Sequence, residues 1–259
     1  MEKSVLTEKK GKVTVITLNV PQKLNALEKR VRIELKSALA QFQNDETGRV
    51  AILTGRGKAF SAGGALEELK AGMDAVNGVS LMADYGEIAT AIANLEKPVI
   101  AAVNGIAVGA GLSLALACDM VIASSGAVFA AVFSKVGFIP DMGATYYLPR
   151  AVGMHRAKEL IFTSRMIKAD EAWRMGIVNQ VVNPDELEKR ACGLAQQLAE
   201  GPGLAFGLTK RILARSLESN LQDMLQYETY AQSICFESQD HREGVRAFYE
   251  KRQPAFKGK

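Results

Sequence analysis

The segment that most constrains the fold is residues 97–119, KPVIAAVNGIAVGAGLSLALACD. Val99–Val103 is a short apolar run of the kind found in buried strands, and an Asn-Gly pair interrupts it. Gly109–Gly111 then begins a predicted helix that runs to Cys118. The first turn of a helix carries unpaired N–H groups, and side chains no larger than a methyl let a ligand oxygen approach them. We therefore predict a strand–turn–helix unit whose turn binds an anion or a developing oxyanion.

Three other interpretations of this segment stay open. The first is a transmembrane helix with a GxxxG face at Gly105 and Gly109, and Asn104 and Asp119 argue against it. The second is a Rossmann phosphate turn, for which the glycine spacing is incomplete and no acidic residue follows about twenty positions on. The third is that the glycines serve helix packing alone.

A second glycine-rich turn, residues 55–64, also follows an apolar strand, Val50–Thr54. Two strand-then-glycine turns, each with free N–H groups, are able to supply one donor each to the same oxygen. This pairing favours a functional reading of both turns over a purely structural one.

Composition places the chain among ordinary globular proteins. Of its 259 residues 48% are hydrophobic and 23% charged, and the net charge of +4 is far from that of a nucleic-acid-binding protein. Three scattered cysteines fit a reducing compartment, and two separated histidines, His155 and His241, argue against a zinc site or a histidine triad. The N-terminal residues lack an apolar signal segment, so we expect a cytoplasmic protein without a membrane anchor.

Hydrophobic periodicity predicts an α/β core followed by helices. The expected strands cover residues 13–18, 50–54, 98–103, 120–123, 127–132 and 176–182. The expected helices cover residues 27–42, 66–70, 81–95, 146–152, 156–163 and 169–175, with mainly helix from 184 to 250. Residues 71–80 are the least patterned and are expected to form a mobile loop near a pocket mouth. Apolar stripes after about residue 195 exceed what a small core covers, which predicts an interdomain or intersubunit surface.

Together these pieces resemble the crotonase (enoyl-CoA hydratase/isomerase) superfamily. The matching segments, in order, are Asn25–Leu27, Lys58–Gly64, Lys97–Gly105, Gly109–Gly111, Cys118–Asp119, Gly137–Asp141, Glu243–Phe248 and Glu250–Arg252. The resemblance implies a ClpP-like ββα spiral as catalytic core, residues 1–195. It also implies a C-terminal helical region, residues 196–259, that builds a homotrimer or a dimer of trimers.

The resemblance assigns the oxyanion donors to the backbone N–H groups of Gly64 and Ala110. The two glutamates of the family's hydratases fall at Ser113 and Phe133, so both carboxylates are absent. One carboxylate remains, that of Asp141 in VGFIPDMGATYYLPR. From composition alone Asp141 is best read as a solvated turn residue. The string resembles ring-1,2-epoxyphenylacetyl-CoA isomerases and related enoyl-CoA isomerases, in which an aspartate here moves protons.

The resemblance also implies where coenzyme A binds, as part of the substrate and with no metal or permanent cofactor. Lys23, Leu24 and Ala26 are expected to line the mouth of the site. The backbone of Ala62, Gly64 and Leu66 is expected near the adenine. Phe248 and Lys251 of a neighbouring subunit are expected to close the phosphate end. For each lysine a solvated surface charge is an equally good reading.

One position departs from the family pattern, because Ala65 replaces the usual aspartate of the glycine turn. This puts the geometry of the loop around the CoA adenine and pantetheine in doubt, whereas the N–H of Gly64 does not depend on that side chain.

We expect an acyl-CoA isomerase in which Asp141 shuttles a proton while Gly64 and Ala110 hold the thioester oxygen. An enoyl-CoA hydratase of fatty-acid oxidation is the main alternative. Thioesterase or dehalogenase chemistry is another, although the dehalogenase branch places a tryptophan where this chain has Phe133. An RNA-binding or non-catalytic relative is the remote alternative, since the helix with Lys29, Arg30, Arg32 and Lys36 has only a thin basic face.

Overall fold

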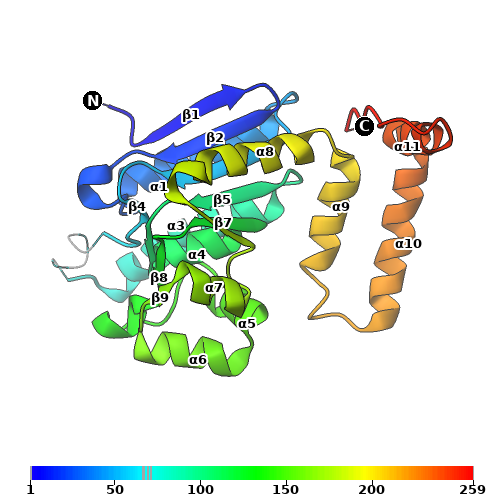
Figure 1. Ribbon diagram of the computed structural model, residues 1–259. Coiled ribbons are helices and arrows are strands. Elements are labelled where there is room, and N and C mark those ends of the chain that lie inside the picture. Colours follow the sequence, from blue (N-terminus) through cyan, green and yellow to red (C-terminus); the bar gives the residue numbers. More distant parts are fainter. Residues whose placement is uncertain (1, 66–67, 69, 71, 259) are drawn as a thin grey trace.

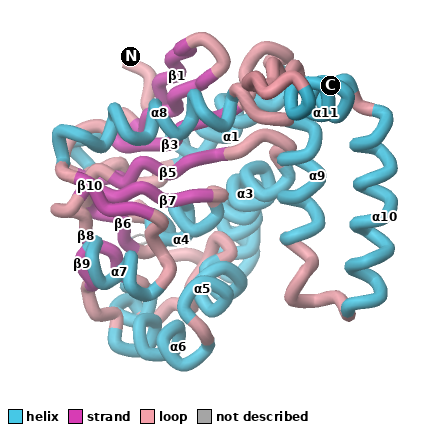
Figure 2. The backbone as a smooth tube through the Cα atoms, turned by 45° about the vertical axis from the view of Figure 1, so that its right-hand side comes forward, coloured by secondary structure: helices cyan, strands magenta, loops and turns pink. Residues whose placement is uncertain are grey.

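The computed structural model describes residues 2–65, 68, 70 and 72–258. Its larger sheet has the strand order β1-β2-β3-β5-β7-β10 (Figures 1 and 2). The strands are β1 Val5–Lys10, β2 Val13–Leu18, β3 Val50–Gly55, β5 Val99–Val103, β7 Met120–Ser124 and β10 Gln180–Val182. β1 and β2 pair antiparallel, and the pairs from β2 to β10 are parallel. Parallel strands covered on both faces need continuous apolar runs, and every residue of β5 is buried.

A smaller sheet follows the order β4-β6-β8-β9. Its strands are β4 Ala59–Ser61, β6 Ile106–Val108, β8 Val128–Ala130 and β9 Ile167–Lys168. Strands β3, β5 and β7 of the larger sheet each lead into a strand of the smaller one, and helices follow, as in β5-β6-α4, where α4 is Ala110–Ala117. This repeated ββα unit confirms the predicted spiral core.

Helices cover both faces of the larger sheet because side chains of successive strand residues point to opposite faces. Val50 and Ile52 share a buried cluster with helix α8, Leu187–Ala199. Ala51 and Leu53 belong to the main core with helices α1, Lys29–Asn44, and α3, Ala75–Asn94. The remaining helices of the core are α5 Ala144–Val152, α6 Met154–Thr163 and α7 Ala169–Met175.

Three C-terminal helices extend away from this core (Figures 1 and 2). They are α9 Gly203–Leu213, α10 Leu221–Glu237 and α11 Gln239–Tyr249. No residue of α10 is buried, and large apolar side chains such as Leu221, Tyr230 and Phe236 lie exposed on it. The predicted boundary at residue 195 falls inside α8, which continues along the sheet to Ala199. Within the described ranges, no helix has the length and apolarity that a membrane crossing requires.

Several local expectations differ from the structure. Residues 75–80 belong to helix α3 and not to a loop, because Asp74 caps the helix by accepting a hydrogen bond from Asn77 N at 2.9 Å. Strand β1 was missed because most of its residues are not buried. The expected late strand 176–182 is confined to Gln180–Val182. Of the expected helix 66–70, only residues 68 and 70 are described, and both are helical.

The first prediction concerns the contact between β4 and α4. A Cβ on Gly111 would lie 2.2 Å from the backbone oxygen of Ser61, so Gly111→Ala should lower the free energy of unfolding by about 2–4 kcal/mol. Gly193→Ala in α8 is the matched control, since nothing lies within 4 Å of its added Cβ and helix propensity should raise stability by about 0.5–1 kcal/mol. Urea unfolding measures both. Equal stability of the two variants contradicts the assigned packing.

Candidate active site

Gly64, Ala110 and Asp141 line one cavity of about 320 Å³. The cavity lies between the turn after β4, the N-terminus of α4, helix α3 and the segment around the 3-10 helix η2, Val132–Val136. Its walls are largely apolar and include Leu81, Met82, Val132, Phe133, Val136 and Phe138. The structure thus brings together the three residues that the sequence singled out for catalysis.

Hydrogen bonding of the preceding residues fixes the turn that presents Gly64. The N–H of Gly63 donates to Ser61 Oγ at 3.1 Å, and the carbonyl of Gly63 accepts from Leu27 N at 2.7 Å. The Gly63–Gly64 peptide is trans, so its N–H points away from the carbonyl that Leu27 holds. Gly63 has φ +84°, and a Cβ there would lie 2.6 Å from Val108 O and 2.9 Å from Ala110 N. Only glycine lets the turn lie this close to α4.

Ala110 is the first residue of α4, where a backbone N–H has no intrahelical acceptor. The preceding Gly109 has φ 54° and ψ −129°, a conformation essentially restricted to glycine. Its N–H donates to Ala130 O at 2.9 Å, which fixes the start of the helix on β8. Neither Gly64 N nor Ala110 N donates to an acceptor among the residues that the structure describes. Two backbone donors are therefore available at this cavity.

Asp141 is a cavity carboxylate and not a solvated turn residue. Its Oδ1 is buried and has no hydrogen-bond partner within the described part of the chain. Burial raises the pKa of Asp141 to about 6. The backbone around it is fixed by Ala144 N, which donates to Asp141 O at 2.9 Å, and by positive φ angles at Met142 and Gly143. A carboxylate with this pKa is able to take up and release a proton near neutral pH.

Glu68 also lines the cavity, but its two oxygens are occupied. Oε1 accepts from the backbone N–H of Lys29 at 2.9 Å, and Oε2 accepts from Arg32 Nη1 at 3.0 Å. Arg32 is itself buried beneath the cavity wall, beside Tyr85. The sequence analysis missed Glu68, Tyr85 and the burial of Arg32. For Arg32 a signal was available, because it lies next to the apolar stripe of α1.

The two positions that hold glutamates in the family's hydratases carry no acid–base group. Ser113 is fully buried, donates to Gly109 O at 3.3 Å and does not line the cavity. Phe133 lines the cavity with an apolar ring. Among the described lining residues, Asp141 and Glu68 are the carboxylates.

Of the expected CoA-binding residues, Ala62 and Gly64 line the cavity. Leu24 lies beside them, since its carbonyl accepts from Ala62 N at 2.8 Å. Lys23 pairs with Glu28, Ala26 is buried, and neither lines the cavity. Leu66 lies outside the described residues.

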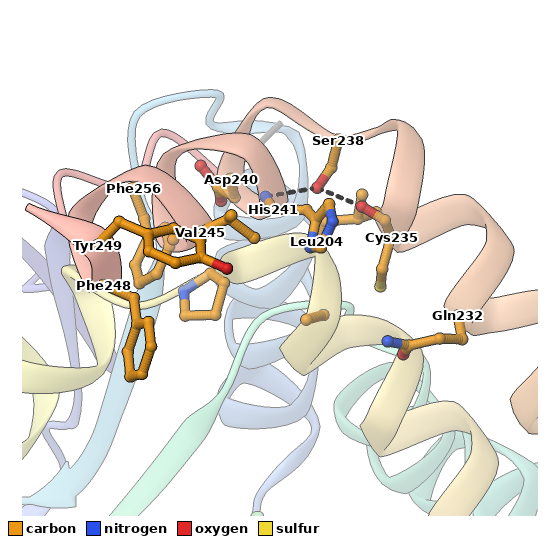
Figure 3. Close-up of a pocket in the computed structure, with 13 residues that line it drawn as sticks. Leu204, Gln232, Cys235, Ser238, Asp240, His241, Val245, Phe248, Tyr249 and Phe256 are labelled. Carbon is orange, nitrogen blue, oxygen red and sulfur yellow. Dashed lines mark hydrogen bonds between the residues drawn. The ribbon is translucent and has the colours of Figure 1, made fainter.

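Phe248 and Lys251 do not line this cavity. Phe248 belongs to α11 and Lys251 follows it, and α11 lies apart from helices α3 and α4 (Figure 1). Phe248 is 79% exposed and lines a separate cavity of about 510 Å³ between α9, α10 and α11 (Figure 3).

Comparison with known proteins decides the family. Residues 8–259 match the enoyl-CoA hydratase/isomerase family. The chain belongs to this family. It is 40% identical over 251 residues to the short-chain-enoyl-CoA hydratase of Clostridium acetobutylicum, covering 96% of each chain. It is 38% identical over 262 residues to the 1,2-epoxyphenylacetyl-CoA isomerase of Escherichia coli, covering 100% of each chain.

The fold of this family member agrees with solved structures of its relatives. The enoyl-CoA hydratase of Bacillus anthracis superposes with a TM-score of 0.94 at 37% identity, covering 99% of this chain and 100% of the other. The protein is therefore an acyl-CoA-acting enzyme of the crotonase superfamily. No group of three or more potential metal ligands of the His, Cys, Asp or Glu type occurs in the described ranges.

The second prediction follows from the raised pKa of Asp141. Because the folded state binds a proton more tightly than the unfolded chain, ionisation of Asp141 costs stability as pH rises through about 6. Asp141→Asn should therefore raise the free energy of unfolding by about 1–3 kcal/mol at pH 7.5 and lose that advantage below about pH 4.

The control is Asp74→Asn. The carboxylate of Asp74 has a lowered pKa because it accepts hydrogen bonds from Asn77. That variant should lose stability above pH 4 and not gain it. Denaturant unfolding across pH measures both, and an Asp141→Asn variant that is less stable than wild type at pH 7.5 contradicts the assigned burial.

Proposed function

We propose that this enzyme is an enoyl-CoA isomerase that moves a proton between the α- and γ-carbons of an allylic acyl-CoA. The observation that carries the proposal is the unpartnered, buried carboxylate oxygen of Asp141 in the same cavity as two free backbone donors, Gly64 N and Ala110 N. Acyl groups with a double bond between the β- and γ-carbons fit this chemistry. The ring-1,2-epoxide of phenylacetyl-CoA is the other candidate substrate, but its isomerisation rearranges the epoxide ring and is not a 1,3-proton transfer.

The reaction divides between backbone and side chain. The thioester oxygen accepts hydrogen bonds from Gly64 N and Ala110 N. Ionised Asp141 takes a proton from the α-carbon of the 3-enoyl thioester, and the C–H electron pair moves into a dienolate whose negative charge rests on that oxygen. Protonated Asp141 then delivers the same proton to the γ-carbon, and the double bond ends between the α- and β-carbons.

Hydration requires a second acid–base group, and the described residues that line the cavity supply no second carboxylate with a free oxygen. One group must deprotonate water while another protonates the α-carbon, and a single carboxylate suffices only for a 1,3-proton transfer. Ser113 does not line the cavity, Phe133 is apolar, and both oxygens of Glu68 are engaged. Hydratase activity is the second candidate because relatives such as those of Clostridium acetobutylicum and Bacillus anthracis carry that name.

An RNA-binding role gains no support from helix α1. Arg32 is buried, and Lys36 pairs with Asp84 and Glu87. Arg30 pairs with Glu34, so three of the four cations considered do not contribute to an open basic face.

We further propose that residues 196–259 form the oligomerisation region. In that arrangement Phe248 and Lys251 of one subunit contact the CoA that is bound to another. The subunit that holds the thioester supplies the other proposed CoA-binding residues, which are Lys23, Leu24, Ala26, Ala62, Gly64 and Leu66.

The third prediction is that Asp141→Asn lowers isomerase kcat about 10²–10⁴-fold and leaves CoA-thioester binding unchanged, because the amide keeps the shape and loses the proton carrier. The assay uses trans-3-hexenoyl-CoA, crotonyl-CoA and the phenylacetyl-derived epoxide in parallel. Asp170→Asn, at an exposed position of α7, is the control and should keep full activity. Undiminished isomerisation by Asp141→Asn refutes the assignment, and rapid hydration of crotonyl-CoA alone favours the hydratase.

The fourth prediction concerns pH. Since Asp141 must be ionised to accept the α-proton, kcat/KM for trans-3-hexenoyl-CoA should rise with pH through about 6 and then level off. The fraction of ionised Asp141 falls about tenfold for each pH unit below that value. Initial rates between pH 4.5 and 8.5 measure the profile. A rate that increases as pH falls below 6 means that the protonated acid starts the reaction, against the proposal.

A further inference from the structure

Arg32 is a buried cation next to the active-site cavity that the proposed reaction does not use. It is 3% exposed and lies on helix α1. Its Nε donates to Asp84 Oδ2 at 2.5 Å, and its Nη1 donates to Glu68 Oε2 at 3.0 Å and to Leu27 O at 2.6 Å. A buried ion pair is a poor source of net stability compared with apolar side chains of similar volume. Its contacts therefore call for another explanation.

Those contacts lead to the backbone donor Gly64 through Leu27. The carbonyl of Leu27 accepts from Arg32 and also from the hydroxyl of Tyr85, at 3.1 Å. The N–H of Leu27 donates to Gly63 O at 2.7 Å, and this carbonyl belongs to the trans peptide that carries the N–H of Gly64. Moving Leu27 therefore turns the donor of the proposed oxyanion site.

Tyr85 contacts Arg32 and also lies close to Gly64 at the cavity. It lines the cavity, its ring stacks under the Arg32 guanidinium at 4.9 Å, and a Cβ added to Gly64 would lie 3.4 Å from its hydroxyl. Burial raises the pKa of Tyr85 to about 12, against the opposing charge of Arg32, so the hydroxyl remains a neutral donor at physiological pH. Asp84 and Glu68 balance the charge of Arg32, which argues against a role in binding an anionic ligand.

We propose that Arg32 and Tyr85 are positioning residues that hold Leu27, and through it the N–H of Gly64, in the orientation that binds the thioester oxygen. The inference rests on the proposed function, which makes Gly64 N an oxyanion donor. Arginine suits this position because its planar fork bridges three acceptors on the 24–27 loop, α3 and residue 68, which a lysine ammonium does not reproduce. A misplacement of such a donor by about 1 Å is enough to lower the rate about 100-fold.

The test uses Arg32→Lys and Tyr85→Phe in the full-length protein. Tyr85→Phe removes one oxygen and keeps the ring, so it remains informative if Arg32→Lys folds poorly. Lys36→Met is the matched control: Lys36 lies one turn further along α1 and also pairs with Asp84, but it contacts neither Leu27 nor the cavity.

Two measurements separate positioning from general stability. Each variant should lower kcat for trans-3-hexenoyl-CoA on the order of 10- to 100-fold with KM changed less than about 3-fold, and Lys36→Met should change neither. Infrared difference spectra of bound [1-¹³C]butanoyl-CoA, which has no double bond to isomerise, report the polarisation of the thioester carbonyl. The band should lie below its free value in wild type and move back towards it in Arg32→Lys and Tyr85→Phe.

The outcomes are distinct. A carbonyl band shifted as far in both variants as in wild type overturns the positioning role. No shift in wild type removes the premise that Gly64 N contacts the thioester, and the inference fails with it. A full shift in wild type that is lost in the variants upholds the inference, even if Asp141→Asn remains active and the proton-transfer part of the proposed function fails.

Discussion

The candidate site depends on the close approach of two backbone segments, the turn that follows β4 and the first turn of α4. Side chains larger than hydrogen at Gly63 and Gly111 would collide with Val108 O and Ser61 O, at 2.6 and 2.2 Å. This contact places Gly64 N and Ala110 N on one cavity, and neither segment is able to form the site alone. The parallel sheet beneath supplies the rigidity, since β3 and β5, which lead into the two turns, pair directly with each other. A donor pair made of backbone is insensitive to side-chain rotamers, which suits a site that must be ready before charge develops.

In the cavity, the surroundings of one carboxylate set its proton affinity. Apolar walls around Asp141 raise its pKa to about 6, and no described neighbour satisfies its Oδ1. A folded protein rarely leaves a buried polar atom unpaired, and such an atom commonly marks a functional site. Glu68 shows the contrast: it faces the same cavity but is held by Arg32 and by the N-terminus of α1. Two carboxylates in one cavity thus have different capacities because of their partners.

Much of this arrangement is predictable from the sequence, and the failures have physical causes. The apolar run of β5 indicates a buried strand, because a strand covered on both faces needs apolar residues throughout. The small residues at the start of α4 indicate a helix N-terminus with accessible N–H groups. Asp141 is identifiable as the remaining carboxylate, but its burial is set by residues distant in sequence. The same holds for Arg32, which looks like a surface cation until Asp84, Glu68 and Leu27 converge on it. Strand β1 carries too few buried residues to be recognised from periodicity.

The most direct test of the central claim is a crystal structure of the enzyme with a saturated or otherwise unreactive acyl-CoA. We predict that the thioester oxygen lies about 3 Å from both Gly64 N and Ala110 N, and that the α- and γ-carbons lie about 3.5 Å from Asp141 Oδ1. A thioester oxygen bound elsewhere, or an acyl chain that leaves Asp141 on the opposite side of the cavity from both carbons, contradicts it.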